Sequence, residues 1–254
     1  MLAQSRGGLP NIALMAVGDE SGGVYSSRYL LNTVRDLHGA VAILPDGGTN
    51  WHIVRESKGL LHLAIDIHGV SGHASRPWKG INAIDRTAQI VQAIRHHYPE
   101  PSAATWDTTV TFSQIESGSP SERNKIPGTA MLFLDVRYPN EVPPETIISR
   151  IERTARTVDP GAAVRRVVTK APFLLTQAPL IERWKALIQG KQTDAIYIQE
   201  EGTADHVYFA EHGIPAIVTA PRGGDAHSDS EWIDLNSMME YGEVLYTFLA
   251  QNAK

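Results

Sequence analysis

The middle of this 254-residue chain carries a pattern of apolar spacing that few folds can satisfy. Near its start, Leu61, Leu63, Ile65 and Ile67 alternate with a set of residues that is more polar on the whole: Leu60, His62, Ala64, Asp66 and His68. That alternation is typical of a strand with one buried face. The elements predicted after it are a helix over 81–97, strands over 108–115 and 129–137, a helix over 143–155 and a strand over 162–168. This order predicts a ferredoxin-like βαββαβ domain at residues 58–169.

The segments on either side follow a different pattern. Continuous apolar runs at 11–17 and 40–44 are each followed by an acidic loop that contains glycine, with a helix-like stretch to about Leu37 between them. Such runs are typical of strands buried on both faces of a parallel sheet. Later patterns predict a helix over 180–188, short strands over 195–198 and 216–219, and a closing helix over 235–249. The sequence therefore predicts an α/β domain, formed by 1–57 and 170–254, into which the small domain is inserted.

Composition excludes several classes of function. The net charge is −5 and no run of lysine or arginine exceeds two residues, which argues against a nucleic-acid partner. No stretch is apolar for long enough to span a membrane. Cysteine is absent, so a thiol nucleophile and thiolate metal ligands are excluded. Met1 is followed by no signal-peptide pattern, and a cytoplasmic location is expected.

Four polar clusters lie in predicted loops of the α/β part: Asp19-Glu20, Asp46, Gly202-Thr203-Ala204-Asp205, and a segment over 225–231 that contains His227. Carboxylates and imidazoles without thiols are the ligands of a hydrolytic zinc site or a related divalent site. Each acid taken singly could instead cap a helix or form a turn. A Gly-x-Ser-x-Gly elbow is absent, which argues against a serine hydrolase.

One histidine, His73, lies in a glycine-containing turn between a strand and a helix. Its segment, from Ser71 to Ile84, resembles the lid signature of a family of dinuclear zinc metallopeptidases. That family includes aminoacylase, acetylornithine deacetylase, succinyl-diaminopimelate desuccinylase and carboxypeptidase G. Further segments resemble the same family in the same order: 17–25, 44–48, 124–127, 134–139, 202–205, 213–215 and 226–233.

The resemblance implies a partial zinc-exopeptidase-like α/β catalytic domain with an inserted lid and dimerisation domain. It implies an amide-bond hydrolase that releases an amino acid from an N-acyl amino acid or a small peptide. Two zinc ions are expected in a complete site, with cobalt or manganese as alternatives. A homodimer through the lid is expected, and in this family the histidine corresponding to His73 reaches into the partner's active site.

The resemblance also assigns residues to the metal site. Glu20 and His227 would bind one zinc, and Asp46 would bind the other. Asp19 would act as the general base on a metal-bridging water. The acidic loop is one residue shorter than the family pattern, so an alternative alignment makes Glu20 the base. We prefer Asp19 because the Gly-Gly-x-Tyr spacing after the loop is then kept.

The remaining assignments concern the substrate. His73 would stabilise the developing oxyanion, and Gly202 and Thr203 would line the pocket. Asn124 and Arg137 would hold the substrate, with the Arg137 guanidinium binding a carboxylate through two parallel hydrogen bonds. From the pattern alone, Arg137 could equally form a surface ion pair, and Asn124 could be only a turn residue.

The family pattern also contains an earlier segment with a His-x-Asp motif and a bridging aspartate, which does not occur before the acidic loop here. The sequence therefore predicts a C-terminal portion of such an enzyme, with little or no activity alone. The alternative is a non-catalytic dimerisation module or a degenerate homologue. The sequence does not specify the acyl group or the amino acid.

Overall fold

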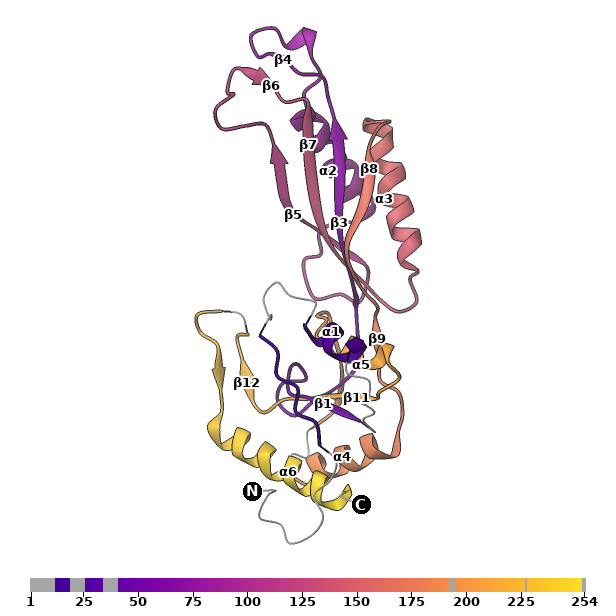
Figure 1. Cartoon of the computed structure of the whole chain (residues 1–254), viewed down its shortest axis with the longest axis vertical. Coiled ribbons are helices and arrows are strands. Elements are labelled where there is room, and N and C mark those ends of the chain that lie inside the picture. Colours follow the sequence, from indigo (N-terminus) through magenta and orange to yellow (C-terminus); the bar gives the residue numbers. More distant parts are fainter. Residues whose placement is uncertain (1–11, 19–25, 34–40, 192–194, 227, 253–254) are drawn as a thin grey trace. The chain divides into compact units, whose positions relative to one another are not determined.

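The computed structural model describes residues 12–18, 26–33, 41–191, 195–226 and 228–252 (Figure 1). Two compact units are present: residues 58–172 form one, and residues 1–57 with 173–254 form the other. The mixed helices and sheets of the two units confirm the predicted α/β class.

The unit of residues 58–172 contains a four-stranded antiparallel sheet in the order β5-β7-β3-β8. Its elements in chain order are β3 (Gly59–His68), α2 (Ala83–His97), β5 (Thr109–Ser117), β7 (Thr129–Tyr138), α3 (Pro144–Val158) and β8 (Ala163–Lys170). A two-stranded antiparallel sheet of β4 (Gly72–His73) and β6 (Lys125–Ile126), and the 3₁₀ helix η2 (Pro77–Lys79), form the tip of this unit (Figure 1). The observed order of elements confirms the predicted ferredoxin-like arrangement.

One face of this sheet forms the core of the unit. The alternating residues of β3 that the sequence predicts to be buried are almost completely so: Leu61, Leu63, Ile65 and Ile67. Helices α2 and α3 contact each other on this face, and each contributes one buried apolar stripe. The opposite face carries the polar side chains of His62, Asp66, Asp135 and Arg137. This core fixes the positions of β3 and β7, and with them the polar groups on the other face.

The second unit contains two small sheets with parallel pairs. Strand β1 (Ala42–Leu44) pairs in parallel with β11 (Ala216–Val218), and β2 (Ile53–Ser57) pairs in parallel with β10 (Tyr197–Glu200) and antiparallel with β9 (Phe173–Leu174). The other elements are α1 (Ser26–Thr33), α4 (Pro179–Gln189), α5 (His206–Glu211), α6 (Leu235–Asn252) and the hairpin of β12 (Gly223–Gly224) with β13 (Trp232–Ile233).

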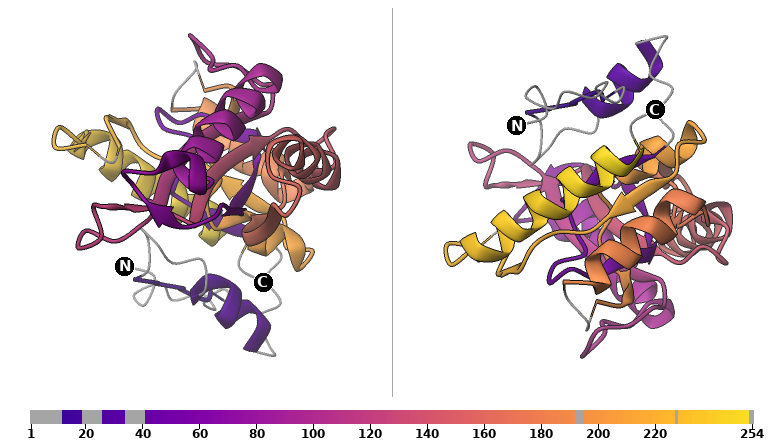
Figure 2. Two further views of the ribbon diagram at one scale, coloured as in Figure 1. Left: turned by 90° about the horizontal axis from the view of Figure 1, so that it is seen from above. Right: turned by 90° about the horizontal axis from the view of Figure 1, so that it is seen from below.

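Helices α4 and α6 lie side by side and cover the core of this second unit (Figure 2). Trp184 of α4 packs edge-on against Tyr241 and Phe248 of α6. The fully buried Trp51 lies against Tyr241 and donates its indole N–H to Ser237 Oγ at 2.8 Å. In the part of the chain that the structure describes, no helix is long and apolar enough to cross a membrane.

One strand prediction is wrong. The apolar run at 11–17 is predicted to be a buried strand, but residues 12–18 form no strand, and Leu14 is 93% exposed. An apolar run gains stability as a strand only when neighbouring strands pair with it and side chains cover it. None of the described strands pairs with this segment. The helix predicted to reach Leu37 is seen as α1, and the residues after Thr33 lie outside the described part.

Candidate active site

Asp46 lies just beyond the carboxyl end of β1, in a loop with an unusual backbone. Gly47, Gly48, Asn50 and Trp51 all have positive φ angles, of 117°, 60°, 60° and 67°. A Cβ atom on Gly48 would lie 2.4 Å from the carbonyl oxygen of His52, so only glycine fits there. Left-handed conformations at Asn50 and Trp51 are costly and persist only where the surrounding structure imposes them. The fold therefore holds the exposed Asp46 carboxylate on a constrained loop.

A second carboxylate, Glu200, joins this loop, and the sequence analysis missed it. The Gly48 backbone N–H donates to Glu200 Oε1 at 2.6 Å, which links the end of β10 to the loop after β1. Burial raises the pKa of Glu200, the bond from Gly48 opposes that rise, and the charges of Asp46 and Glu201 add to it. The signal that could have found it is a pair of acids, Glu200 and Glu201, within three residues of the end of a predicted strand, because ligand sites lie at the carboxyl ends of parallel strands.

The loop after β10 carries the predicted pocket residues. Gly202 is exposed and Thr203 is half-buried between β10 and α5. Asp205, at the start of α5, accepts a hydrogen bond from the hydroxyl of Ser27 in the first turn of α1. Bonds from Gly48 and Ser27 thus bring the loop over 200–205 together with the Asp46 loop and the start of α1.

Three of the predicted metal-site residues, Asp19, Glu20 and His227, lie outside the described residues. Within the described part, no group of three or more histidines and acids is placed to hold a metal ion. The donor chemistry of Asp46 and Glu200 still suits a divalent cation, since carboxylate oxygens bind such ions and a cation offsets the burial and the neighbouring negative charges that raise the Glu200 pKa. The assignment of the full ligand set remains a prediction.

His73 and Asn124 come together at the tip of the unit of residues 58–172. His73 ends β4 and pairs with Lys125 of β6, while the backbone N–H of Ala74 donates to the Asn124 carbonyl at 2.8 Å. Both His73 and Asn124 are exposed. The structure therefore presents two of the predicted substrate-contacting residues side by side at the small β4–β6 sheet.

Arg137 lies near the far end of β7 and forms the ion pair that the sequence analysis left open. Its Nε and Nη2 atoms donate to the two oxygens of Asp135, at 2.7 and 3.0 Å. His62 Nε2 lies 3.0 Å from the same carboxylate. Asp135 occupies one edge of the guanidinium, so the Nη1–Nη2 edge remains able to bind a second carboxylate.

The tip and Arg137 are far apart within this unit. Thr129, at the tip end of β7, pairs with His68, and Arg137 follows eight residues later along the same strand. At the rise of an extended strand, this separation is roughly 27 Å. A small substrate therefore cannot contact both Asn124 and Arg137 of one copy.

Asp135 should make the stability of the protein sensitive to acid. Burial alone would raise its pKa, but hydrogen bonds from His62 and Arg137 outweigh burial and lower the pKa to about 2. A carboxylate whose pKa is lower in the folded protein stabilises it above its unfolded pKa of about 4, and that stabilisation is lost as the pH falls toward 2. We expect Asp135→Asn to reduce the slope of unfolding free energy against pH between about 4 and 2. Urea titrations across this range would measure it.

A matched control is Glu122→Gln, because Glu122 forms only an exposed pair with Lys125. This variant should keep the slope of unfolding free energy against pH that the unmodified protein shows between about 4 and 2. If Asp135→Asn also keeps that slope, Asp135 is not the cause of the acid sensitivity.

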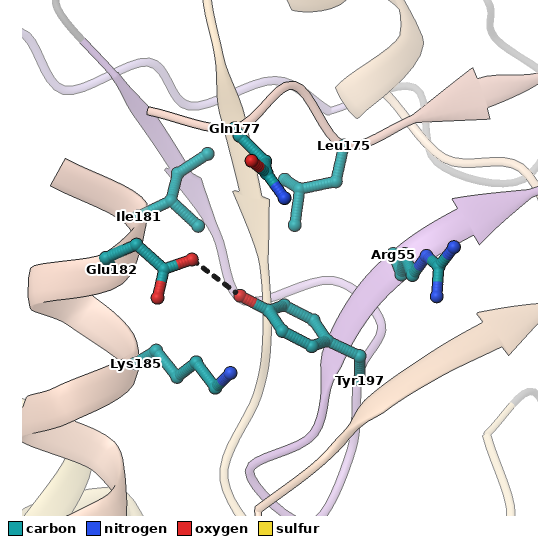
Figure 3. A pocket seen from close by; sticks show the side chains of 7 residues that line it. All are labelled: Arg55, Leu175, Gln177, Ile181, Glu182, Lys185 and Tyr197. Carbon is teal, nitrogen blue, oxygen red and sulfur yellow. Dashed lines mark hydrogen bonds between the residues drawn. The ribbon is translucent and has the colours of Figure 1, made fainter. Parts of the chain in front are cut away.

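A separate cavity of about 250 Å³ lies beside α4, β2 and β10 (Figure 3). Its lining residues are Arg55, Leu175, Gln177, Ile181, Glu182, Lys185 and Tyr197. The Tyr197 hydroxyl donates to Glu182 Oε1 at 3.3 Å, and Lys185 Nζ lies 4.3 Å from the centre of the Tyr197 ring. None of the predicted site residues that the structure describes lines this cavity, so it is treated as separate from the candidate active site.

Comparisons with known proteins find similar chains among peptidases and desuccinylases. Residues 55–163 match the peptidase dimerisation domain of the M20 family. The chain is 24% identical to a succinyl-diaminopimelate desuccinylase of Magnetococcus marinus, over 74% of this chain and 50% of that protein. It is 25% identical to the Shewanella pealeana desuccinylase, over 71% of this chain and 48% of that protein. The aminopeptidase PepT of Bacillus cereus has the same fold, with a TM-score of 0.68 over 88% of this chain and 61% of that one, at 19% identity.

The chain is therefore similar to M20 peptidases in two respects: residues 55–163 match their dimerisation domain, and the chain has the fold of a peptidase of known structure. It spans about half the length of the curated relatives it matches.

Proposed function

We propose that this chain contributes to a metal-dependent amide hydrolase that releases an amino acid from an N-acyl amino acid or a small peptide. The observation that carries the proposal is the bond from Gly48 to Glu200, which joins two polar loops at the ends of parallel strands in a chain that carries a match to the M20 dimerisation domain. The names of its relatives, a desuccinylase and an aminopeptidase, describe reactions of this class.

In this proposal Glu20 and His227 hold one zinc ion and Asp46 holds the other, with cobalt or manganese as alternatives. When bound, the metal supplies polarisation of the scissile carbonyl and a lowered pKa for the attacking water. The Asp19 carboxylate would serve as the general base that accepts a proton from the attacking water and returns it to the leaving amine. Glu200 restrains the Asp46 loop through the Gly48 amide.

The remaining residues bind and orient the substrate. Gly202 and Thr203 line the pocket, and the free edge of Arg137 binds the carboxylate of the amino acid. His73 donates a hydrogen bond to the developing oxyanion, and Asn124 binds beside it. Because the tip lies roughly 27 Å from Arg137 along β7, we propose a homodimer in which the tip of each copy completes the site of the other.

Complementation between two inactive variants tests both the reaction and the shared site. Asp46→Asn and His73→Ala chains would be prepared separately and co-expressed, then assayed with zinc on N-acetyl amino acids, N-succinyl amino acids and tripeptides. A chain carrying the family's His-x-Asp segment would be supplied in trans in every activity assay here and below, because the present chain alone is expected to have little or no activity. Each variant alone should be inactive. Random pairing makes half of the dimers mixed, each with one intact site, so co-expression should restore about a quarter of the unmodified activity.

The outcomes separate the two parts of the proposal. If the unmodified chain is active but the two co-expressed variants stay inactive, the shared site is contradicted. No hydrolysis by the unmodified chain on any of these substrates would contradict the proposed reaction and favour a non-catalytic dimerisation module.

A further inference from the structure

We propose that Ser75 is a positioning residue that holds His73 in the tautomer with its proton on Nε2. The Ser75 backbone N–H donates to His73 Nδ1 at 3.2 Å, and the Ser75 hydroxyl oxygen lies 2.8 Å from the same nitrogen. The catalytic meaning of this contact rests on the proposed function, but the tautomer itself does not.

The backbone contact decides the direction of the hydrogen bonds. A backbone N–H can only donate, so the nitrogen that faces it must present a lone pair. The Ser75 hydroxyl then also donates to Nδ1. In a neutral imidazole, a lone pair on Nδ1 places the proton on Nε2. Ser75 therefore favours the Nε2–H form of His73.

The turn keeps Ser75 in this position. The Arg76 backbone N–H donates to the His73 carbonyl at 2.9 Å, which closes a tight turn around residues 74 and 75. The pairing of His73 with Lys125 and the bond from Ala74 to the Asn124 carbonyl hold the start of the turn on β6. Because one of the two donors is a backbone N–H held by this turn, that contact forms without ordering the Ser75 side chain.

The tautomer matters for the role proposed for His73. The ring is exposed at the tip, and among the described residues none bonds to its Nε2. With the proton on Nε2, the histidine offers a neutral hydrogen-bond donor to an oxyanion. With the proton on Nδ1, the same position would present a lone pair, which repels developing negative charge. Ser75 thus acts through His73 and does not itself contact the substrate.

The tautomer can be read by NMR on the chain itself, without any activity. Long-range proton–nitrogen spectra of ¹⁵N-histidine-labelled protein, at a pH where the ring is neutral, report which ring nitrogen carries the proton. The His73 signals are those lost in His73→Gln. We expect the Nε2–H form in the unmodified protein and in Ser75→Thr, and a measurable increase of the Nδ1–H form in Ser75→Ala. Ser121→Ala, at an exposed serine of the loop before β6, should change nothing.

Two results would overturn the proposal: the Nδ1–H form in the unmodified protein, or the same tautomer populations in Ser75→Ala. Where hydrolysis is measured, Ser75→Ala should lower kcat by up to about tenfold with KM unchanged, less than the loss of a whole oxyanion donor. Ser75→Thr should restore kcat. An absence of hydrolysis would count against the proposed function, while the spectra would still decide the tautomer.

Discussion

Replacing Asp159 with alanine is expected to lower the free energy of unfolding by about 3–5 kcal/mol, because a buried charge pair loses one partner. Asp159 ends α3 and is only 2% exposed. It accepts the backbone N–H groups of His68 at 2.7 Å and Gly161 at 3.1 Å, and it pairs with Arg86 at 3.1 Å. These bonds join β3, α2 and α3, so alanine would leave two backbone amides without their acceptor. It would also remove the charged partner of Arg86, whose guanidinium would keep its bond to the His68 carbonyl.

The matched control is Asp66→Ala, on the open face of the same sheet. Asp66 pairs with Arg165 at 2.7 Å, but both side chains are substantially exposed. An exposed pair contributes between about 0 and 1 kcal/mol, so this variant should unfold nearly like the unmodified protein in urea. Equal losses of unfolding free energy in Asp159→Ala and Asp66→Ala would show that burial is not the cause. The loss in Asp159→Asn should lie between these two values.

Replacing His73 with alanine is expected to lower kcat by about 100- to 1000-fold, which is the usual effect of removing one oxyanion donor. The side chain is exposed at the tip, so the thermal midpoint of unfolding should stay the same. Because the interaction is proposed to form only with the transition state, KM should change little. Steady-state kinetics on the best substrate of the panel, with zinc present, would measure both parameters.

His96→Ala is the control for this experiment. His96 is also exposed in the same unit, near the end of α2, where its ring contacts only His97 among the ring pairs of the described residues. It should retain full activity. If His73→Ala keeps most of the activity of the unmodified enzyme, His73 does not take part in the reaction.

The fold of residues 58–172 was predictable because each of its main elements has a clear hydrophobic pattern within its own short segment. Alternation over β3 and the single apolar stripes of α2 and α3 each specify an element and its buried face within one short segment. Strand β2 was missed, since its partners β9 and β10 lie more than a hundred residues away in sequence. The run at 11–17 failed for the opposite reason: its local pattern is strong, but no described strand pairs with it.

The candidate site was predictable only in part. The position of Asp46 follows from the rule that ligand sites lie at the carboxyl ends of parallel strands. Glu200 was missed because an acidic pair in a loop resembles a solvated turn, and its contact with Gly48 spans 152 residues of sequence. The pairing of Arg137 with Asp135 was one of two alternatives, since residues two apart on a strand share a face.

The central claim is that the Asp46 loop belongs to a metal site that includes Glu20 and His227. Elemental analysis of the purified chain after equilibrium dialysis against zinc tests it directly. The account predicts at least one zinc ion per chain, loss of that zinc in Asp46→Asn and His227→Ala, and weaker binding in Glu200→Ala. Asp66→Asn, which changes an exposed carboxylate on the sheet of the other unit, should bind like the unmodified chain. Equal zinc contents in the unmodified chain and in Asp46→Asn would contradict the account.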